Sequence, residues 1–159
     1  MTTATDDEPE RVERQWAVDL FNHVWSLMDK AERTADDDAE MVHAAHASCL
    51  HWLHVGGPVN AVRGEWQCSR VYAILGRAEP ARHHAERALA LCQAHTIGDF
   101  DLAFAYEALA RAAAISGDTT EASRWVALAH GACEDIAEAD DKELVLADLA
   151  TIPGLGGAA

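Results

Sequence analysis

The residues of this chain best suited to bind a ligand are arginines and aromatic side chains that recur at helical spacings. They form two stripes with the spacing i, i+3 and i+7, which are Arg63, Trp66 and Arg70 and then Phe104, Glu107 and Arg111. Residues spaced in this way lie on one face of a helix. Guanidinium groups hold carboxylates or phosphates in bidentate geometry and stack on aromatic faces. The stripes therefore predict a pocket for an anionic group, such as a peptide carboxylate or a small acid.

A third stripe and an alternative explanation follow from the same residues. Arg63 and Phe104 begin the two stripes. Moving the first stripe towards the N-terminus by the separation between these two residues places a third stripe at Asn22, Trp25 and Asp29. Trp25 is thereby a further candidate on the ligand-binding face. The alternative is an internal ion-pair network in which acidic residues neutralise the arginines. The acidic candidates are Glu65, Glu107, Asp99 and Asp101. Both can hold together, because a pocket without ligand often pairs its own charges.

Histidines form a second group with chemical potential. Four of them fall within a sector of about 140° on one predicted helix, and they are His43, His46, His51 and His54. Glu40 lies three residues before His43, a spacing found in carboxylate-bridged metal sites of helical bundles. One hypothesis is therefore a divalent metal ion with Glu40, His43 and His46 as ligands, which requires at least three donors that converge. A solvated stripe is the favoured alternative, and a pH sensor is the third.

The sequence carries few signs of catalysis. It has no nucleophile elbow and no phosphate-binding loop, and Asp99 and Asp101 stand where helix-capping residues are expected. The four cysteines each stand alone within a helical pattern, without a CxxC pair, and are expected to be reduced and buried. We therefore favour a non-enzymatic role, and no cofactor is predicted beyond the metal ion considered above.

The charge balance excludes two classes of partner. The chain has 27 acidic and 12 basic residues and a formal net charge of −15, a field that repels nucleic acids and anionic membrane surfaces. No apolar run approaches the roughly 20 residues of a membrane span, and the first ten residues lack the apolar centre of a signal peptide. We therefore expect a cytoplasmic protein that binds neither nucleic acid nor membrane.

Helices must position these residues, since the chain is rich in Ala, Leu, Glu and Arg and its 159 residues fit one domain. Apolar periodicity and breaker residues predict seven helices, at about 10–33, from the acidic link 34–38 to 55, and at 60–75, 79–95, 100–116, 121–136 and 141–150. Residues 1–9 are expected to be disordered, 10–150 to form the domain and 151–159 to form a flexible tail. Two roles stay open for the last helix, which are to cap the others or to face a second copy of the chain in a homo-oligomer, and capping is the favoured one.

Two segments of the sequence are related to each other. Residues 68–91 align with residues 109–132, so that Gly76 matches Gly117 and small residues match at three further positions: Ala81 with Ala122, Ala85 with Val126 and Ala88 with Ala129. We call the separation from Gly76 to Gly117 the repeat offset. Residues 62–134 resemble tetratricopeptide repeats, although the repeat offset exceeds their period of about 34 by about two helical turns. The resemblance implies an all-α fold of antiparallel helical hairpins, stacked as a right-handed solenoid of about seven helices. It also implies a concave groove lined by the first helix of each hairpin.

The resemblance specifies a fold and leaves the ligand open. Residues 63–84 and 98–112 are also similar to segments of a group of uncharacterised bacterial proteins, which adds no activity. We therefore expect a non-enzymatic binding or adaptor module whose groove, lined by Arg and Trp, takes an anionic ligand or a peptide segment. The alternative is a metal-binding helical protein, including an enzyme, that uses His and carboxylate ligands.

Overall fold

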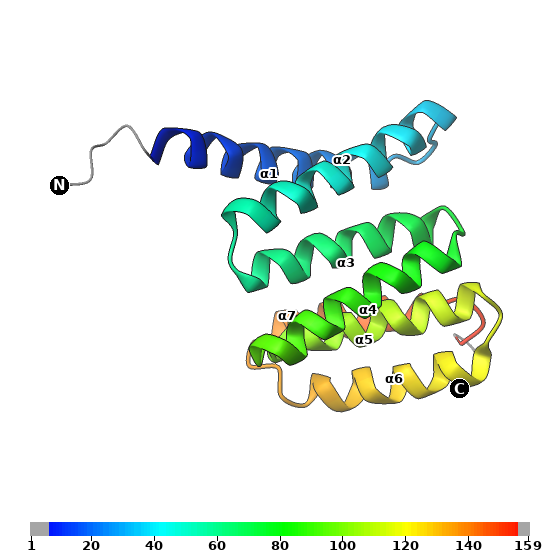
Figure 1. Cartoon of the computed structure of the whole chain (residues 1–159). Helices are drawn as coiled ribbons and strands as arrows, with labels where there is room; N and C mark the ends of the chain where they lie inside the picture. The colour runs from blue at the N-terminus through cyan, green and yellow to red at the C-terminus, as the bar shows by residue number, and fades with distance from the viewer. Residues whose placement is uncertain (1–6, 156–159) are drawn as a thin grey trace.

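The computed structural model describes residues 7–155, and this part of the chain forms seven helices and no strand (Figure 1). The all-α prediction is confirmed. The helices are α1 (Asp7–Met28), α2 (Ala35–Val55), α3 (Pro58–Ile74), α4 (Ala78–His95), α5 (Asp99–Ile115), α6 (Thr119–Cys133) and α7 (Ala139–Ala150). None of them combines the length and the apolar character that crossing a membrane requires.

The link between α1 and α2 shows how local chemistry sets the helix ends. Thr34 caps α2 by accepting a hydrogen bond from the amide of Asp37 at 3.1 Å, and the Asp37 carboxylate accepts one from the amide of Thr34 at 2.9 Å. This capping box satisfies two amides that the first turn leaves without helical partners. Hydrogen bonds from Lys30 and from the Thr34 amide lower the pKa of Asp37 to about 2. The acidic link therefore caps α2, and α1 ends at Met28, five residues before the predicted end.

The helices pack as three antiparallel hairpins, α1/α2, α3/α4 and α5/α6, followed by α7 (Figure 1). The odd-numbered helices form a connected layer, because α1 packs on α3, α3 on α5 and α5 on α7. The even-numbered helices reach one another through long side chains, as in the ion pair between Arg82 on α4 and Glu121 on α6. Fully buried alanines allow close approach of the helices, and they include Ala81, Ala85, Ala88, Ala122 and Ala129.

The aligned glycines end α3 and α5 in the same way. Gly76 and Gly117 have φ values of 69° and 86°. The amide after Gly76 donates to the carbonyl of Tyr72 at 2.9 Å, and the amide after Gly117 donates to the carbonyl of Ala113 at 3.0 Å. These are the hydrogen bonds of a left-handed helix terminus, where glycine avoids the strain of a β-carbon. The repeat offset therefore holds in the backbone as well as in the sequence.

This geometry predicts opposite effects for two glycine substitutions. Gly76→Ala should lower the free energy of unfolding by about 1–2 kcal/mol, because an L-residue is strained at positive φ although space for the β-carbon is free. Gly131→Ala is the matched control, since Gly131 lies within α6 with equally free space. Alanine should stabilise that position by about 0.5–1 kcal/mol. Urea unfolding followed by circular dichroism measures both, and a neutral Gly76→Ala variant would contradict the assigned helix terminus.

The two ends of the chain differ from the expected boundaries. Helix α1 begins at Asp7, within the segment 1–9 that we expected to be disordered, while residues 1–6 lie outside the described part. The segment after α7 is packed rather than free, because Ile152 is only 2% exposed and joins a cluster with Val145, Leu149 and Leu155. The expectation of a flexible tail is therefore wrong for the stretch that contains Ile152 and Leu155, and residues 156–159 lie outside the described part.

Candidate functional site

The layer of odd-numbered helices contains a pocket with a volume of about 460 Å³. We call it the aromatic pocket. Its lining comes from four helices and comprises Phe21 and Trp25 of α1, Val62, Arg63, Trp66 and Arg70 of α3, Phe100, Asp101 and Phe104 of α5, and Leu144 and Asp148 of α7. Seven of these eleven side chains are apolar or aromatic, so the pocket offers mainly a surface for apolar groups.

Aromatic rings form a continuous wall across three helices. Trp66 on α3 lies between Trp25 on α1, at a ring-centroid distance of 5.9 Å, and Phe104 on α5, at 5.4 Å. Phe104 in turn meets the edge of Phe100 at 5.7 Å. Tilted and edge-to-face contacts at these distances are favourable for aromatic pairs. Trp25 remains 37% exposed, so the wall is reached from solvent at its α1 end.

Two arginines contribute the positive charge of the pocket, and each is paired. Arg63 donates two hydrogen bonds to the carboxylate of Asp101, at 2.9 and 3.0 Å, and its guanidinium lies 4.9 Å from the ring centre of Phe100. The hydrogen bonds to Asp101 raise the pKa of Arg63, against the opposing effect of burial. Arg70 pairs with Asp148 and lies 5.5 Å from the ring centre of Trp66. Arg63 is the more accessible, with 46% of its side chain exposed against 12% for Arg70.

A buried ion-pair network joins this pocket to α7. The carboxylate of Glu107 is 1% exposed and accepts hydrogen bonds from Arg111 at 2.8 and 2.5 Å, with Arg70 at 3.7 Å. Arg111 also donates to the carbonyl of Asp148 at 2.9 Å and to the hydroxyl of Thr151 at 2.8 Å. Burial raises the pKa of Glu107, and the two arginines oppose that rise. Arg111 therefore fixes the end of α7 against α5.

The structure brings together five of the seven expected ligand-binding residues in the aromatic pocket, namely Trp25, Arg63, Trp66, Arg70 and Phe104. Glu107 and Arg111 are the corrections, since neither belongs to its lining. Both side chains lie at the contact between α5 and α7. The position of α7 against α5 cannot be inferred from the spacing of residues along α5. The pocket and the internal ion-pair network thus occur together, although Glu65 pairs elsewhere, with His84 and Arg87.

Several lining residues were not predicted from the sequence, and two of them, Phe21 and Phe100, could have been predicted from their spacing. Phe21 precedes Trp25 by four residues, and Phe100 precedes Phe104 by four, a spacing that places both members of each pair on one helix face. Inspecting the residue four positions before Trp25 and before Phe104 would have found both. Leu144 and Asp148 offered no such signal, because they line the pocket only through the packing of α7 on α5.

The expected metal ligands do not converge. Glu40 pairs with His23 of α1 at 2.7 Å, and His43 lies in a separate hollow beside Leu75 and Arg77. His51 and His54 both bind Glu13 of α1 instead, at 3.0 and 2.8 Å. The ligand set Glu40, His43 and His46 is therefore wrong, because α1 supplies nearby partners to the outer side of α2.

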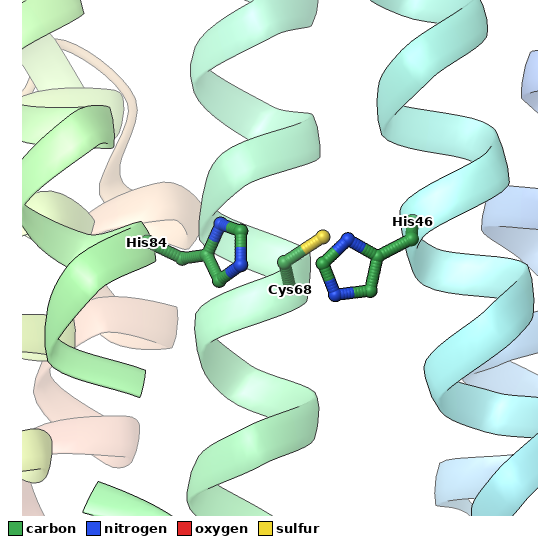
Figure 2. Close-up of side chains that lie close together, drawn as sticks. All are labelled: His46, Cys68 and His84. Atoms are coloured by element: carbon green, nitrogen blue, oxygen red, sulfur yellow. The ribbon is translucent and has the colours of Figure 1, made fainter. Parts of the chain in front are cut away.

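His46 belongs to a different group, which joins three helices. Within the described residues, one donor atom each from His46 of α2, Cys68 of α3 and His84 of α4 lie within 4.8 Å of one another (Figure 2). We call these three residues the His–Cys cluster. Cys68 is fully buried, as the sequence predicts, and all four cysteines are free and buried.

Relatives give no independent indication of function. Comparisons of the chain with protein-family models, curated proteins and solved structures find no match. The aromatic pocket and the His–Cys cluster therefore provide the basis for any assignment.

Proposed function

We propose that this chain is a non-enzymatic binding module whose aromatic pocket takes the apolar or aromatic group of a small molecule or peptide segment, with an anionic end at Arg63. The observation that carries the proposal is the aromatic wall, in which Trp25, Trp66 and Phe104 from three different helices line one opening. The volume of about 460 Å³ falls within the range of small-molecule sites, roughly 300–1,000 Å³.

The residues that line the pocket favour binding through apolar contact over binding through charge. Each arginine already has a carboxylate partner, so a simple anion must compete with Asp101 or Asp148. An aromatic or aliphatic group, in contrast, gains contact with the wall without displacing any ion pair. Arg63 is half exposed at this wall, so a ligand carboxylate can share its guanidinium with Asp101. We therefore assign affinity to the apolar part of the ligand and orientation to Arg63.

We also propose that the three hairpins form a tetratricopeptide-like right-handed solenoid with the pocket on its concave side. Three observations support this arrangement. The repeat offset relates the ends of α3 and α5. The odd-numbered helices pack more closely together than the even-numbered ones. The pocket lies among the odd-numbered helices, which such a stack turns towards its ligand. An adaptor that binds an extended peptide segment fits this geometry.

The proposal predicts selective binding of an aromatic anion. We expect one molecule of 8-anilinonaphthalene-1-sulfonate to bind per chain, with energy transfer from the tryptophans of the wall. The neutral analogue N-phenyl-1-naphthylamine should bind about two- to fivefold more weakly, because the contribution of a half-exposed guanidinium is modest. Arg63→Gln should remove this preference while binding of the neutral probe persists. Fluorescence titration of the folded chain measures all four affinities.

Arg14 offers a matched control for this experiment. Its side chain is also 46% exposed and its guanidinium lies 5.8 Å from the ring centre of Trp52, outside the pocket. Arg14→Gln should leave both affinities unchanged. If neither probe shows saturable binding, the aromatic pocket is not a binding site. If the two probes bind equally well, only the proposed role of Arg63 is wrong.

A further inference from the structure

The His–Cys cluster lies at the contact between the first hairpin, α1/α2, and the second hairpin, α3/α4. Cys68 lies on α3, which packs against both α2 and α4, and the two imidazoles approach it from these neighbours. Figure 2 shows the Cys68 sulfur between the two rings, with a nitrogen of each ring turned towards it. The cluster thus brings two nitrogen donors and one sulfur donor from three helices to one point.

Hydrogen bonds on the far side of each ring leave the inner nitrogen free. Nδ1 of His84 lies 2.7 Å from a carboxylate oxygen of Glu65, so Nε2 of this ring is available. Nε2 of His46 lies 2.9 Å from the hydroxyl of Tyr72, so Nδ1 of that ring is available. A carboxylate that accepts a hydrogen bond from Nδ1–H fixes the tautomer in which Nε2 carries a lone pair, as it does behind metal-binding histidines.

The supporting residues are themselves held in place. Glu65 is almost fully buried and accepts a second hydrogen bond, from Arg87 at 2.6 Å. The Tyr72 ring stacks on His84 with an interplanar angle of 8° and a centroid distance of 5.8 Å. Because these neighbours constrain the imidazole rings of His46 and His84, the two side chains lose little conformational freedom when an ion binds.

Comparison with the next hairpin shows that the fold does not require these polar residues. The repeat offset maps Glu65 onto Tyr106 and His84 onto Trp125, and these two rings stack on each other at 6.0 Å. Cys68 maps onto Leu109, which is also buried. The third hairpin, α5/α6, thus fills the equivalent space with Tyr106, Leu109 and Trp125. The second hairpin, α3/α4, has a buried carboxylate and a histidine at the two positions where the third hairpin has stacked aromatic rings.

We propose that His46, Cys68 and His84 form a zinc site. Two imidazoles and a thiolate suit Zn²⁺ and disfavour Mg²⁺ or Ca²⁺, which prefer oxygen ligands. Donors bound to zinc at about 2.0–2.3 Å lie roughly 3.5 Å apart, so the cluster must contract by about 1 Å from its 4.8 Å limit. His46 is exposed, which leaves the fourth position of the tetrahedron to water from solvent.

Binding the ion requires one proton to leave. A buried cysteine is a neutral thiol at neutral pH, and Cys68 is fully buried. Formation of the zinc–sulfur bond therefore releases the thiol proton to solvent, and both histidines bind as neutral rings. No oxidant or further reactant takes part. This site is independent of the aromatic pocket and does not rest on the proposed function.

Cobalt provides a spectroscopic test with the reduced, tag-free full chain. We expect Co²⁺ to bind with a stoichiometry of one, to give a thiolate-to-cobalt charge-transfer band, and to be displaced by Zn²⁺. His46→Ala should weaken Co²⁺ binding by more than about 100-fold, since losing even an outer-shell partner costs about 10- to 100-fold. Cys68→Ala should abolish the charge-transfer band. Glu65→Gln, which changes a positioning residue, should weaken binding by about 10- to 100-fold and retain the band.

Two substitutions serve as matched controls. His43 lies on α2 three residues before His46, and Cys92 is a buried cysteine of α4 outside the cluster. His43→Ala and Cys92→Ala should leave both affinity and spectrum unchanged. Cobalt binding without a charge-transfer band, or a band that survives in Cys68→Ala, would overturn the proposal. If Cys68→Ala fails to fold, the Co²⁺ affinity of His46→Ala is the test, because His46 is exposed and its loss should leave the fold intact. An unchanged affinity in His46→Ala would overturn the proposal.

Discussion

Replacing Trp66 with alanine is expected to weaken binding of 8-anilinonaphthalene-1-sulfonate by about 30-fold or more. Trp66 lies at the centre of the wall, in contact with Trp25 and Phe104 and beneath the guanidinium of Arg70. A central aromatic residue of this kind contributes roughly 2 kcal/mol or more to binding, which corresponds to that factor. Its loss also separates the α1 side of the wall from the α5 side. Fluorescence titration under the conditions used for the wild-type chain measures the effect.

Trp66 also packs within the protein, so a second variant guards against unfolding. Trp25 is partly exposed on α1, and Trp25→Ala should weaken probe binding about tenfold while the circular dichroism spectrum stays unchanged. The matched control is Trp16→Ala, because Trp16 lies on the same helix, is 54% exposed and is absent from the pocket lining. If all three variants bind the probe equally well, the aromatic pocket is not the binding site.

The aromatic wall is the part of the site that the sequence predicts best. Two of its rings, Trp25 and Trp66, are separated by the repeat offset that also relates the helix ends at Gly76 and Gly117. Phe104 lies one repeat offset after Arg63 and shares the stripe spacing with it. A shared position in a repeat implies a shared direction relative to the stack. Trp25 and Trp66 therefore meet although they are distant in sequence.

Residues whose role depends on the docking of a later helix could not be assigned in this way. Glu107 and Arg111 follow the stripe spacing, yet the packing of α7 against α5 takes them into an internal network. The same limit applies to the His–Cys cluster. Spacing along α2 identified His46 but paired it with Glu40 and His43, whereas its neighbours come from two other helices. Convergence across helices depends on their axial alignment, which no single-helix pattern records.

Glu40 and His43 show the converse case, in which contacts with other helices take precedence over a spacing along one helix. Glu40 and His43 have a metal-site spacing on α2, but Glu40 pairs with His23 of α1, and His43 lies in a hollow of α2 that Leu75 and Arg77 also line. An exposed carboxylate near an imidazole needs only one partner to be satisfied, and α1 provides it through His23. Spacing on one helix is therefore weak evidence for a metal site unless a neighbouring helix presents a further donor.

The network around Glu107 should give the largest effect on stability. Arg111→Met removes two hydrogen bonds to a carboxylate that is 1% exposed, and it releases α7 from its contacts at Asp148 and Thr151. Breaking a buried ion pair by removing one partner costs about 3–5 kcal/mol, because the remaining charge stays buried. We therefore expect the free energy of unfolding in urea to fall by that amount. Arg124→Met, an exposed substitution on α6, should stay within about 0.5 kcal/mol.

The pH dependence and a second substitution identify the buried charge as the cause. Since the pKa of Glu107 is raised in the folded state, its ionisation lowers stability as pH rises above the usual glutamate value, and this contribution vanishes below that value. Removing Arg111 raises the folded-state pKa further, so the deficit of Arg111→Met relative to wild type should shrink between neutral pH and about pH 4. Glu107→Gln removes the charge, and adding it to Arg111→Met should restore about 1 kcal/mol or more. A deficit that is constant with pH and unchanged by Glu107→Gln would assign the effect of Arg111 to its contacts with α7 alone.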